Sequence, residues 1–196
     1  MAESTLAARL LDVIENDILP LTRLGVSRGN KVFGAAILLK SDLSLVIAET
    51  NNEIENPLWH GEMHTLKKLY ERPRSDIPPA SDCIFLSTHE PCSLCLSAIT
   101  WAGFDNFYYF FTYEDTRDAF SIPHDLRILD EVFRLSDGNY RRNNAFWKAR
   151  AVKDLIAELP QSQQDPLLAR AMSIAAEYDR LSASYQSTKS DTIPLA

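Results

Sequence analysis

The segment CIFLSTHEPCSLCLSAITWAGF (residues 83–104) joins a strand pattern to a helix pattern that begins at two cysteines. Its first part is apolar and rich in β-forming residues, as a buried strand requires. Its second part starts with a proline and ends at Gly103, positions at which these two residues favour the start and the end of a helix. Cys92 and Cys95 lie three residues apart at the helix start, so their sulfur atoms share one face.

Alternating strand and helix patterns surround this segment. Two apolar runs upstream of it are separated by a short polar turn, which predicts a hairpin, and a further apolar run follows it. This order predicts an α/β sandwich in which the later strands are reached through helical crossovers. The other predicted elements are a helix ended by Pro20 (5–19), the hairpin (31–40 and 44–50), a helix (60–72), a strand (106–113) and mostly helical structure to about residue 186.

Length and composition restrict the class of protein. The chain has 196 residues, a net charge of −7 and 45% hydrophobic residues, which suits one globular domain with an appendage. Three cysteines are too few for a secreted disulfide framework and favour a reducing compartment, so we expect a cytoplasmic protein. No apolar run is long enough to cross a membrane, and the amphipathic N-terminus has no targeting pattern. The acidic balance disfavours nucleic acid as a partner and favours a small neutral substrate.

A histidine and a glutamate precede the cysteines in the chain. The motif HGEMH (residues 60–64) places His60 two residues before Glu62 at the predicted start of a helix. Zinc prefers tetrahedral sites of thiolate and imidazole, and a catalytic site keeps one position for water. His60, Cys92 and Cys95 would supply three ligands. Gly61 would allow the backbone to come close to a ligand.

Each motif also has a structural interpretation. A lone C-x-x-C is often a redox pair or half of a structural zinc knuckle, and a lone H-x-E carries little information. A structural zinc site would need a fourth ligand, but the remaining cysteine, Cys83, starts a predicted strand where a buried, inert thiol is expected. Together and in this order the two motifs match the signature of zinc deaminases that act on bases.

The sequence resembles the cytidine-deaminase-like zinc hydrolases over roughly residues 30–115. It is most similar to the branch of free-base guanine and cytosine deaminases and tRNA adenosine deaminases. The similarity lies in VFGAAIL (32–38), NNEIENPLWHGE (51–62) and STHEPCSLCLSAITWAGF (87–104). Most of this branch has alanine between the histidine and the glutamate, whereas Gly61 stands here, as in fungal cytosine deaminases. The resemblance implies a three-layer α/β/α sandwich with a mixed central sheet and extra C-terminal helices.

The resemblance also implies the parts of the site. Zn²⁺ would be the cofactor, held by the histidine and the two cysteines, and Glu62 would be the catalytic acid and base, outside the metal ligands. Phe33, Asn51, Gly61 and Asp125 would bind the substrate, although Asn52 could take the place of Asn51. Asp125 could equally cap the helix that starts there.

We therefore expect hydrolytic deamination of a small nucleobase of the cytosine or guanine type, or of a related aminated heterocycle, with release of ammonia. Zinc lowers the pKa of its bound water to about 7, and Glu62 would carry protons from that water to the ring and to the departing amine. The alternatives are a nucleoside deaminase, a tRNA adenosine deaminase and a non-catalytic zinc-binding module. The sequence does not name the base.

The C-terminal third suggests how the chain is divided and what it contacts. We expect a deaminase domain at residues 1–160, a helical extension at 161–186 and a flexible tail at 187–196. The stretch RRNNAFWKARAVK (141–153) is basic and aromatic, which leaves RNA open as a partner. An amphipathic helix that packs Phe146 onto the sheet is the interpretation we favour. The helical extension would pack across the interface of a homodimer.

Overall fold

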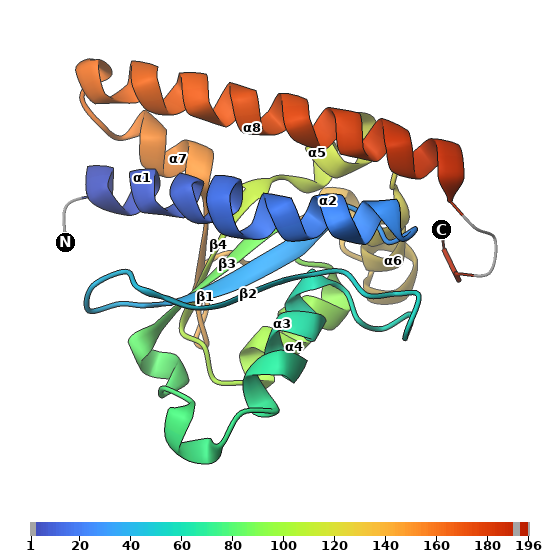
Figure 1. The fold of residues 1–196 in the computed structure, drawn as a ribbon, viewed down its shortest axis with the longest axis horizontal. Coiled ribbons are helices and arrows are strands. Elements are labelled where there is room, and N and C mark those ends of the chain that lie inside the picture. The colour runs from blue at the N-terminus through green and yellow to red at the C-terminus, as the bar shows by residue number, and fades with distance from the viewer. Residues whose placement is uncertain (1–2, 190–192, 196) are drawn as a thin grey trace.

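The computed structural model describes residues 3–189 and 193–195. A central sheet lies between two layers of helices, which confirms the predicted α/β/α sandwich with a mixed sheet and C-terminal helices (Figure 1). The strand order is β2-β1-β3-β4-β5. The strands are β1 (Gly34–Leu39), β2 (Leu45–Thr50), β3 (Cys83–His89), β4 (Asn106–Phe111) and β5 (Lys148–Ala151).

The sheet changes direction between its two halves. Strand β1 pairs antiparallel with both β2 and β3, whereas β3, β4 and β5 are parallel. Parallel neighbours need crossover connections, and helices supply them here. The carboxyl ends of β3 and β4 therefore point in the same direction, and ligand-binding sites in open α/β sheets usually lie at this end of the strands.

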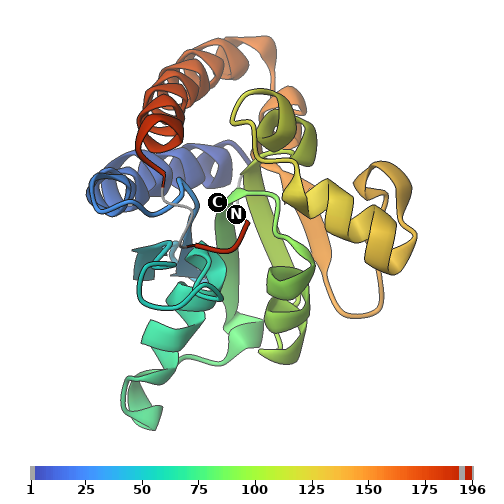
Figure 2. The same ribbon diagram turned by 90° about the vertical axis from the view of Figure 1, so that its right-hand side faces the viewer.

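Helices cover both faces of the sheet. One face carries α1 (Glu3–Val13), α2 (Leu19–Ser27), α7 (Val152–Ala157) and α8 (Gln161–Thr188), and the other carries α3 (Gly61–Tyr70) and α4 (Ser93–Trp101) (Figures 1 and 2). Two helices follow β4: α5 (Tyr113–Asp118) and α6 (His124–Phe133). Short 3₁₀ turns occupy Arg74–Asp76, Ala80–Asp82 and Ser136–Gly138. Strand β3 is buried along its whole length, as its apolar sequence predicted.

The first helix does not end at Pro20, contrary to the prediction. A π-helical turn, Ile14–Ile18, joins α1 to α2, and the N–H of Leu19 donates to the carbonyl of Ile14. Proline normally breaks a helix because it lacks an N–H group and clashes with the preceding turn. Here it lies at the first positions of α2, directly after the wider turn, where proline is tolerated.

The basic stretch 141–153 is also not the amphipathic helix that we favoured. Residues 148–151 form the edge strand β5, and only Val152–Ala157 is helical. Phe146 does not pack onto the sheet, since it is 70% exposed in the loop before β5. Short apolar stretches carry no clear period, so a four-residue strand next to a helix is easily taken for helix.

Helix α8 packs on its own chain. Its buried residues Ile174, Tyr178 and Tyr185 belong to the same apolar cluster as α1 and α2. The apolar side of α8 therefore covers the N-terminal helices of the same chain, and packing of this helix across a homodimer interface stays a prediction. The predicted tail 187–196 falls partly outside the described residues. Within its described part, residues 187 and 188 belong to α8 and Ile193 is buried.

Candidate active site

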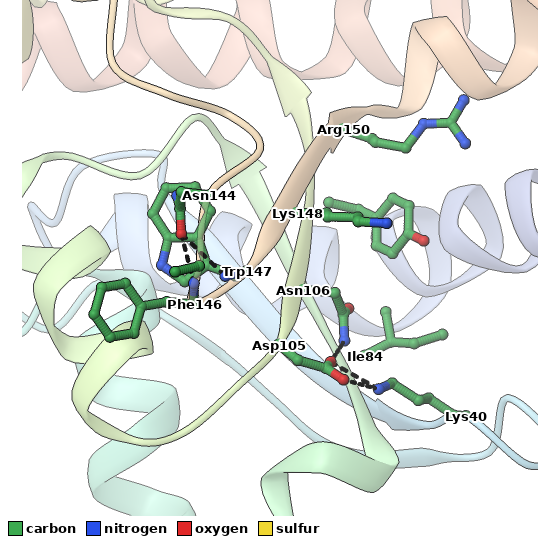
Figure 3. Close-up of a pocket in the computed structure, with 11 residues that line it drawn as sticks. Lys40, Ile84, Asp105, Asn106, Asn144, Phe146, Trp147, Lys148 and Arg150 are labelled. Atoms are coloured by element: carbon green, nitrogen blue, oxygen red, sulfur yellow. Dashed lines mark hydrogen bonds and ion pairs between the residues drawn. The ribbon is translucent and has the colours of Figure 1, made fainter.

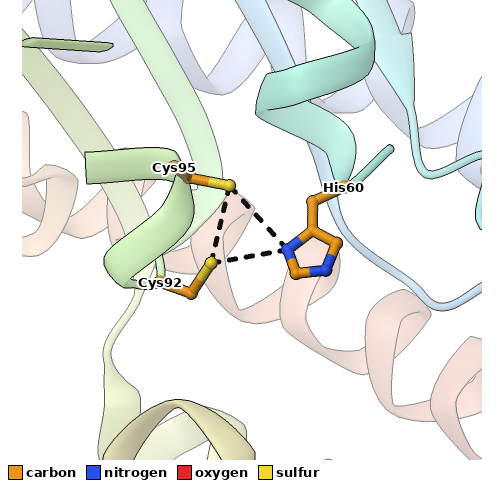
Figure 4. Close-up of side chains that lie close together, drawn as sticks. All are labelled: His60, Cys92 and Cys95. Atoms are coloured by element: carbon orange, nitrogen blue, oxygen red, sulfur yellow. Dashed lines mark hydrogen bonds between the residues drawn. The ribbon is translucent and has the colours of Figure 1, made fainter. Parts of the chain in front are cut away.

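The N-termini of α3 and α4 meet at one point and bring three predicted metal ligands together. His60 directly precedes α3, and Cys92 directly precedes α4, with Cys95 one turn further along. Figure 4 shows the imidazole facing the two sulfur atoms. His60 Nδ1 lies 3.4 Å from Cys92 Sγ and 3.8 Å from Cys95 Sγ, and the two sulfurs are 3.6 Å apart.

These distances suit a zinc ion. Tetrahedral zinc with Zn–S of about 2.3 Å and Zn–N of about 2.0–2.1 Å separates two sulfurs by about 3.8 Å and a sulfur from a nitrogen by about 3.6 Å. The three observed separations fall within a few tenths of an ångström of those values. Among the described residues, His60, Cys92 and Cys95 form the one such cluster of possible ligands. A fourth, tetrahedral position would remain for solvent or substrate.

Glu62 lies next to the three possible metal ligands but is not one of them. It is in the first turn of α3 and 4% exposed. Its Oε1 accepts a hydrogen bond of 2.8 Å from Ser87 Oγ on β3, and its Oε2 lies 3.3 Å from Cys95 Sγ. Burial raises the pKa of this carboxyl, and the negative charge of Cys92 raises it further. A buried carboxyl with a raised pKa is suited to both taking and giving a proton near neutral pH.

The two thiols differ in acidity when no metal is bound. The hydrogen bond from the Cys95 thiol, with the nearby imidazole of His60, lowers the pKa of Cys92 well below its ordinary value. Burial and the Cys92 thiolate raise the pKa of Cys95 well above its ordinary value. Burial is the largest single influence and opposes the protonation of His60. The hydrogen bond to Cys92 and the negative charges of Cys92, Glu62 and Glu53 together outweigh it, so the pKa of His60 rises to about 9. Metal binding would therefore displace protons from His60 and Cys95.

A cavity of about 330 Å³ opens next to these ligands. This volume is at the lower end of the range of small-molecule sites, roughly 300–1,000 Å³. Its wall is mainly apolar, with a few polar groups. A much smaller hollow continues inward, where Glu62 and His89 lie. Apolar side chains of the outer wall include Phe33, Pro57, Leu58, Leu94, Ile122 and Ile128.

The predicted substrate residues fall into two groups. Phe33 and Asp125 line both the cavity and its inner hollow. Burial raises the pKa of Asp125 to about 8, and the charge of Cys92 adds to the rise. Asn51 is buried behind the wall, where its amide donates to Glu53, and Gly61 packs against Gly34 of β1. Neither Asn51 nor Gly61 is among the residues that line the cavity.

Several residues of the site were not predicted. Lys31 and Glu53 form a buried ion pair in the cavity wall, and His89 lies in the inner hollow with a pKa that burial lowers to about 3. Pro194 and Leu195, at the end of the chain, also line the cavity. Lys31 and Glu53 lie in loops, His89 is the last residue of β3, and Pro194 and Leu195 lie near the C-terminus, so no common spacing relates these residues to the metal motifs. The one feature of the sequence that could have indicated these residues is Lys31, a charged residue directly before an apolar strand.

A larger hollow, of about 610 Å³, lies at the opposite ends of the parallel strands (Figure 3). Lys40, Lys148 and Arg150 line it, but none of the three metal ligands does. Lys40 is neutralised by Asp105 at 2.7 Å. We place the candidate active site at the smaller cavity, because the titratable groups with perturbed pKa values gather there.

Comparisons with known proteins link part of the chain to a family of zinc-binding deaminases. Residues 21–111 match the model of the "Cytidine and deoxycytidylate deaminase zinc-binding region". A search of curated protein sequences finds no match.

Solved structures share the fold at low sequence identity. A mutant of the protein NE0047 in complex with 8-azaguanine is 16% identical with a TM-score of 0.54, and covers 89% of this chain and 84% of that one. A guanine deaminase from Nitrosomonas europaea is 16% identical with a TM-score of 0.51, at 87% and 84% coverage. NE0047 in complex with 2,6-diaminopurine is 14% identical with a TM-score of 0.50, at 97% and 84% coverage.

Proposed function

We propose that the chain is a member of the cytidine-deaminase-like superfamily and a zinc-dependent hydrolase that removes the amino group of a small nucleobase or related heterocycle. The observation that carries the proposal is the place of Glu62. Its carboxylate lies 3.3 Å from a ligand sulfur but is not a member of the three-ligand cluster. A carboxylate beside a metal, rather than bound to it, is free to move protons.

In this proposal His60, Cys92 and Cys95 hold the metal. When bound, zinc supplies an electrophilic centre with an open position that activates water at neutral pH. Glu62 takes a proton from the attacking water and delivers it to a ring nitrogen. Glu62 then takes the second proton from the hydroxyl group now attached to the ring carbon and gives it to the amino group. The C–N bond breaks, a carbonyl forms at that carbon, and ammonia leaves. Ser87 holds one oxygen of Glu62, so the other is the one that moves protons.

Substrate recognition is assigned to the cavity wall. Phe33 would pack against the face of the heterocycle, and Asp125 would hydrogen-bond to its edge. Asn51 and Gly61 remain proposed substrate residues from the family resemblance, and Asn51 would have to reach the substrate from behind Glu53. Structural neighbours solved with 8-azaguanine and 2,6-diaminopurine support a base-sized ligand of the purine type.

RNA editing is the second candidate, and the charge of the basic stretch gives it little support. Three of its cations already pair with acids of the same chain. Arg142 pairs with Glu90, Arg150 with Glu3 and Glu158, and Lys153 with Asp115. A phosphate backbone would have to displace these carboxylates.

The test is release of ammonia from guanine, cytosine, adenine and their nucleosides by the zinc-loaded protein. We expect a free base to be the preferred substrate. Glu62→Gln should retain zinc and lose turnover by roughly 10²–10⁴-fold, because the amide cannot carry protons. Glu71→Gln, a change at the exposed end of the same helix, serves as the matched control.

A Glu62→Gln variant that releases ammonia at the parent rate would remove the proposed role of this residue. Zinc binding without turnover on any base or nucleoside would favour the RNA candidate or a non-catalytic zinc-binding module. A tRNA substrate whose deamination falls steeply with added salt would select the RNA candidate.

Location and assembly complete the proposal. Among residues 3–189 and 193–195, no helix is long and apolar enough to span a bilayer. We propose a cytoplasmic location because thiols that bind a metal must stay reduced, and all three cysteines are free.

A homodimer is also proposed. Trp101 on α4, which is 91% exposed, is an apolar side chain that such a contact would cover, and sedimentation of Trp101→Glu against the parent tests it.

A further inference from the structure

A buried ion pair stands in the wall of the cavity. Lys31 Nζ lies 2.9 Å from Glu53 Oε1, and the two side chains are 6% and 1% exposed. Asn51 Nδ2 donates to the other oxygen, Oε2, at 2.8 Å. Two charges are stable away from water only when they are paired and hydrogen-bonded. Both oxygens of this carboxylate therefore have a fixed partner.

Two loops build this pair into the site. Lys31 precedes β1 and Glu53 follows β2, and the N–H of Asn51 donates to the carbonyl of Phe33 at 2.9 Å. The loop that carries Glu53 is closed by a second backbone hydrogen bond of 2.8 Å, from Asn52 to the carbonyl of the residue before His60. The position of the carboxylate is thus tied to the position of the histidine.

The imidazole of His60 lies between the thiols and this carboxylate. Its Nδ1 faces the sulfurs of Cys92 and Cys95, and its Nε2 lies 3.8 Å from Glu53 Oε1. A metal ion binds an unprotonated ring nitrogen, so the proton of the neutral ring sits on the other nitrogen. With a metal on Nδ1, the Nε2–H group is on the side of Glu53. Metal-bound histidines commonly donate this second N–H to a carboxylate, which fixes the ring and strengthens it as a ligand.

We propose that Glu53, held by Lys31 and Asn51, is a positioning residue for His60 in the metal site. The inference rests on the proposed function, because it assumes that His60 binds zinc. The separation of 3.8 Å exceeds a hydrogen bond, so the two groups must approach each other when the metal binds. Lys31 has a second role. It keeps the carboxylate from turning to the metal as a fourth protein ligand, and so preserves the open position.

The test compares zinc affinity among variants, measured by competition with a chromophoric chelator. Glu53→Gln removes the charge and leaves Lys31 unpaired. The double variant Lys31→Met with Glu53→Gln removes both charges and avoids a buried, unpaired lysine. We expect each variant to bind zinc about 10–100-fold more weakly than the parent. The absorption bands of the cobalt-loaded double variant should also shift, since His60 is no longer held.

The control neutralises an exposed pair in the same way. Lys40→Met with Asp105→Asn changes an ion pair at the other end of the strands, and its zinc affinity and cobalt spectrum should equal those of the parent. If Glu53 were only structural, its variants would melt at a lower temperature but bind zinc as tightly as the parent. That result would overturn the inference.

A measurement on the unaltered protein covers the case in which the variants do not fold. In a crystal structure of the zinc-loaded protein, His60 Nε2 should lie within about 3.2 Å of a Glu53 oxygen. A distance that stays at 3.8 Å, or a Glu53 oxygen bound to zinc, would overturn the inference while leaving the proposed function intact. A parent protein that binds no zinc would overturn both.

Discussion

The grouping of His60, Cys92 and Cys95 into one candidate metal site was predictable from the sequence, whereas the residues that support this group were not. His60, Glu62, Cys92 and Cys95 were found because zinc chemistry demands particular residue types, and because short spacings at helix starts determine which side chains meet. Their supporting residues meet through loop contacts and through a hydrogen bond between β3 and α3, and no local spacing in the sequence predicts these contacts. These are Lys31, Glu53, Ser87 and His89.

His89 allows a prediction about stability and pH. It is 3% exposed and packs against Phe33, Phe111 and Phe120, and burial lowers its pKa to about 3. Below pH 6.5 the unfolded chain takes up a proton at this histidine and the folded chain does not. Its contribution to the free energy of unfolding is therefore complete above pH 6.5 and is lost as the pH falls from 6.5 toward 3.

Between pH 7.5 and pH 5 the burial of this histidine should lower the free energy of unfolding of the parent by roughly 2 kcal/mol, because each pH unit below 6.5 contributes about 1.4 kcal/mol. Denaturant unfolding of His89→Leu at both pH values should show a correspondingly smaller loss. His124→Gln changes a more exposed histidine whose pKa burial lowers less, so its loss should lie closer to that of the parent than the loss of His89→Leu does. Equal losses in all three proteins would show that His89 is protonated in the folded state.

At the scale of elements, the site depends on the close approach of α3 to β1. A Cβ atom added to Gly61 would lie 2.7 Å from the Cα of Gly34 and 2.8 Å from its backbone nitrogen. Packing therefore favours a glycine between His60 and Glu62, because a larger residue would meet the backbone of β1. The strand and helix order was predictable from apolar patterns. The passage of a helix through Pro20 and the short strand β5 were not, because they depend on a π-helical turn and on sheet pairing.

Gly61→Ala should therefore destabilise the protein by about 1–3 kcal/mol, because backbone atoms of β1 cannot move aside as a flexible side chain would. Thermal or denaturant unfolding measures the loss. Lys68→Ala, a surface change on the same helix, should stay within about 0.5 kcal/mol of the parent. A Gly61→Ala protein as stable as the parent would mean that α3 can shift away from β1 at no cost.

At the scale of the whole molecule, α8 is part of the core. Tyr178 is fully buried and its ring lies 5.3 Å from Phe111 of β4 and 5.7 Å from His89. Arg170 ties the helix to α1 and the adjoining turn through Asp12 and Glu15. The predicted division into a domain at 1–160 and an extension at 161–186 rests on the amphipathic pattern of the last helix, and such a pattern does not show what the helix packs against.

Loss of this packing should destabilise the whole fold. Tyr178→Ala should lower the free energy of unfolding by about 3–5 kcal/mol and keep a single cooperative transition. Met172→Ala, on the exposed side of α8, should have little effect because that side chain is 73% exposed. Separate unfolding of α8 while the sheet stays folded would instead support an independent extension.

The central claim is a metal centre with three protein ligands and one open position, beside a carboxylate that is not bound to it. X-ray absorption of the zinc-loaded protein tests it most directly. We predict two sulfur atoms at about 2.3 Å and two nitrogen or oxygen atoms at about 2.0–2.1 Å, with one of the latter exchangeable for a small anion. The absence of zinc from these thiols, or a fourth position filled by Glu62, would contradict the account.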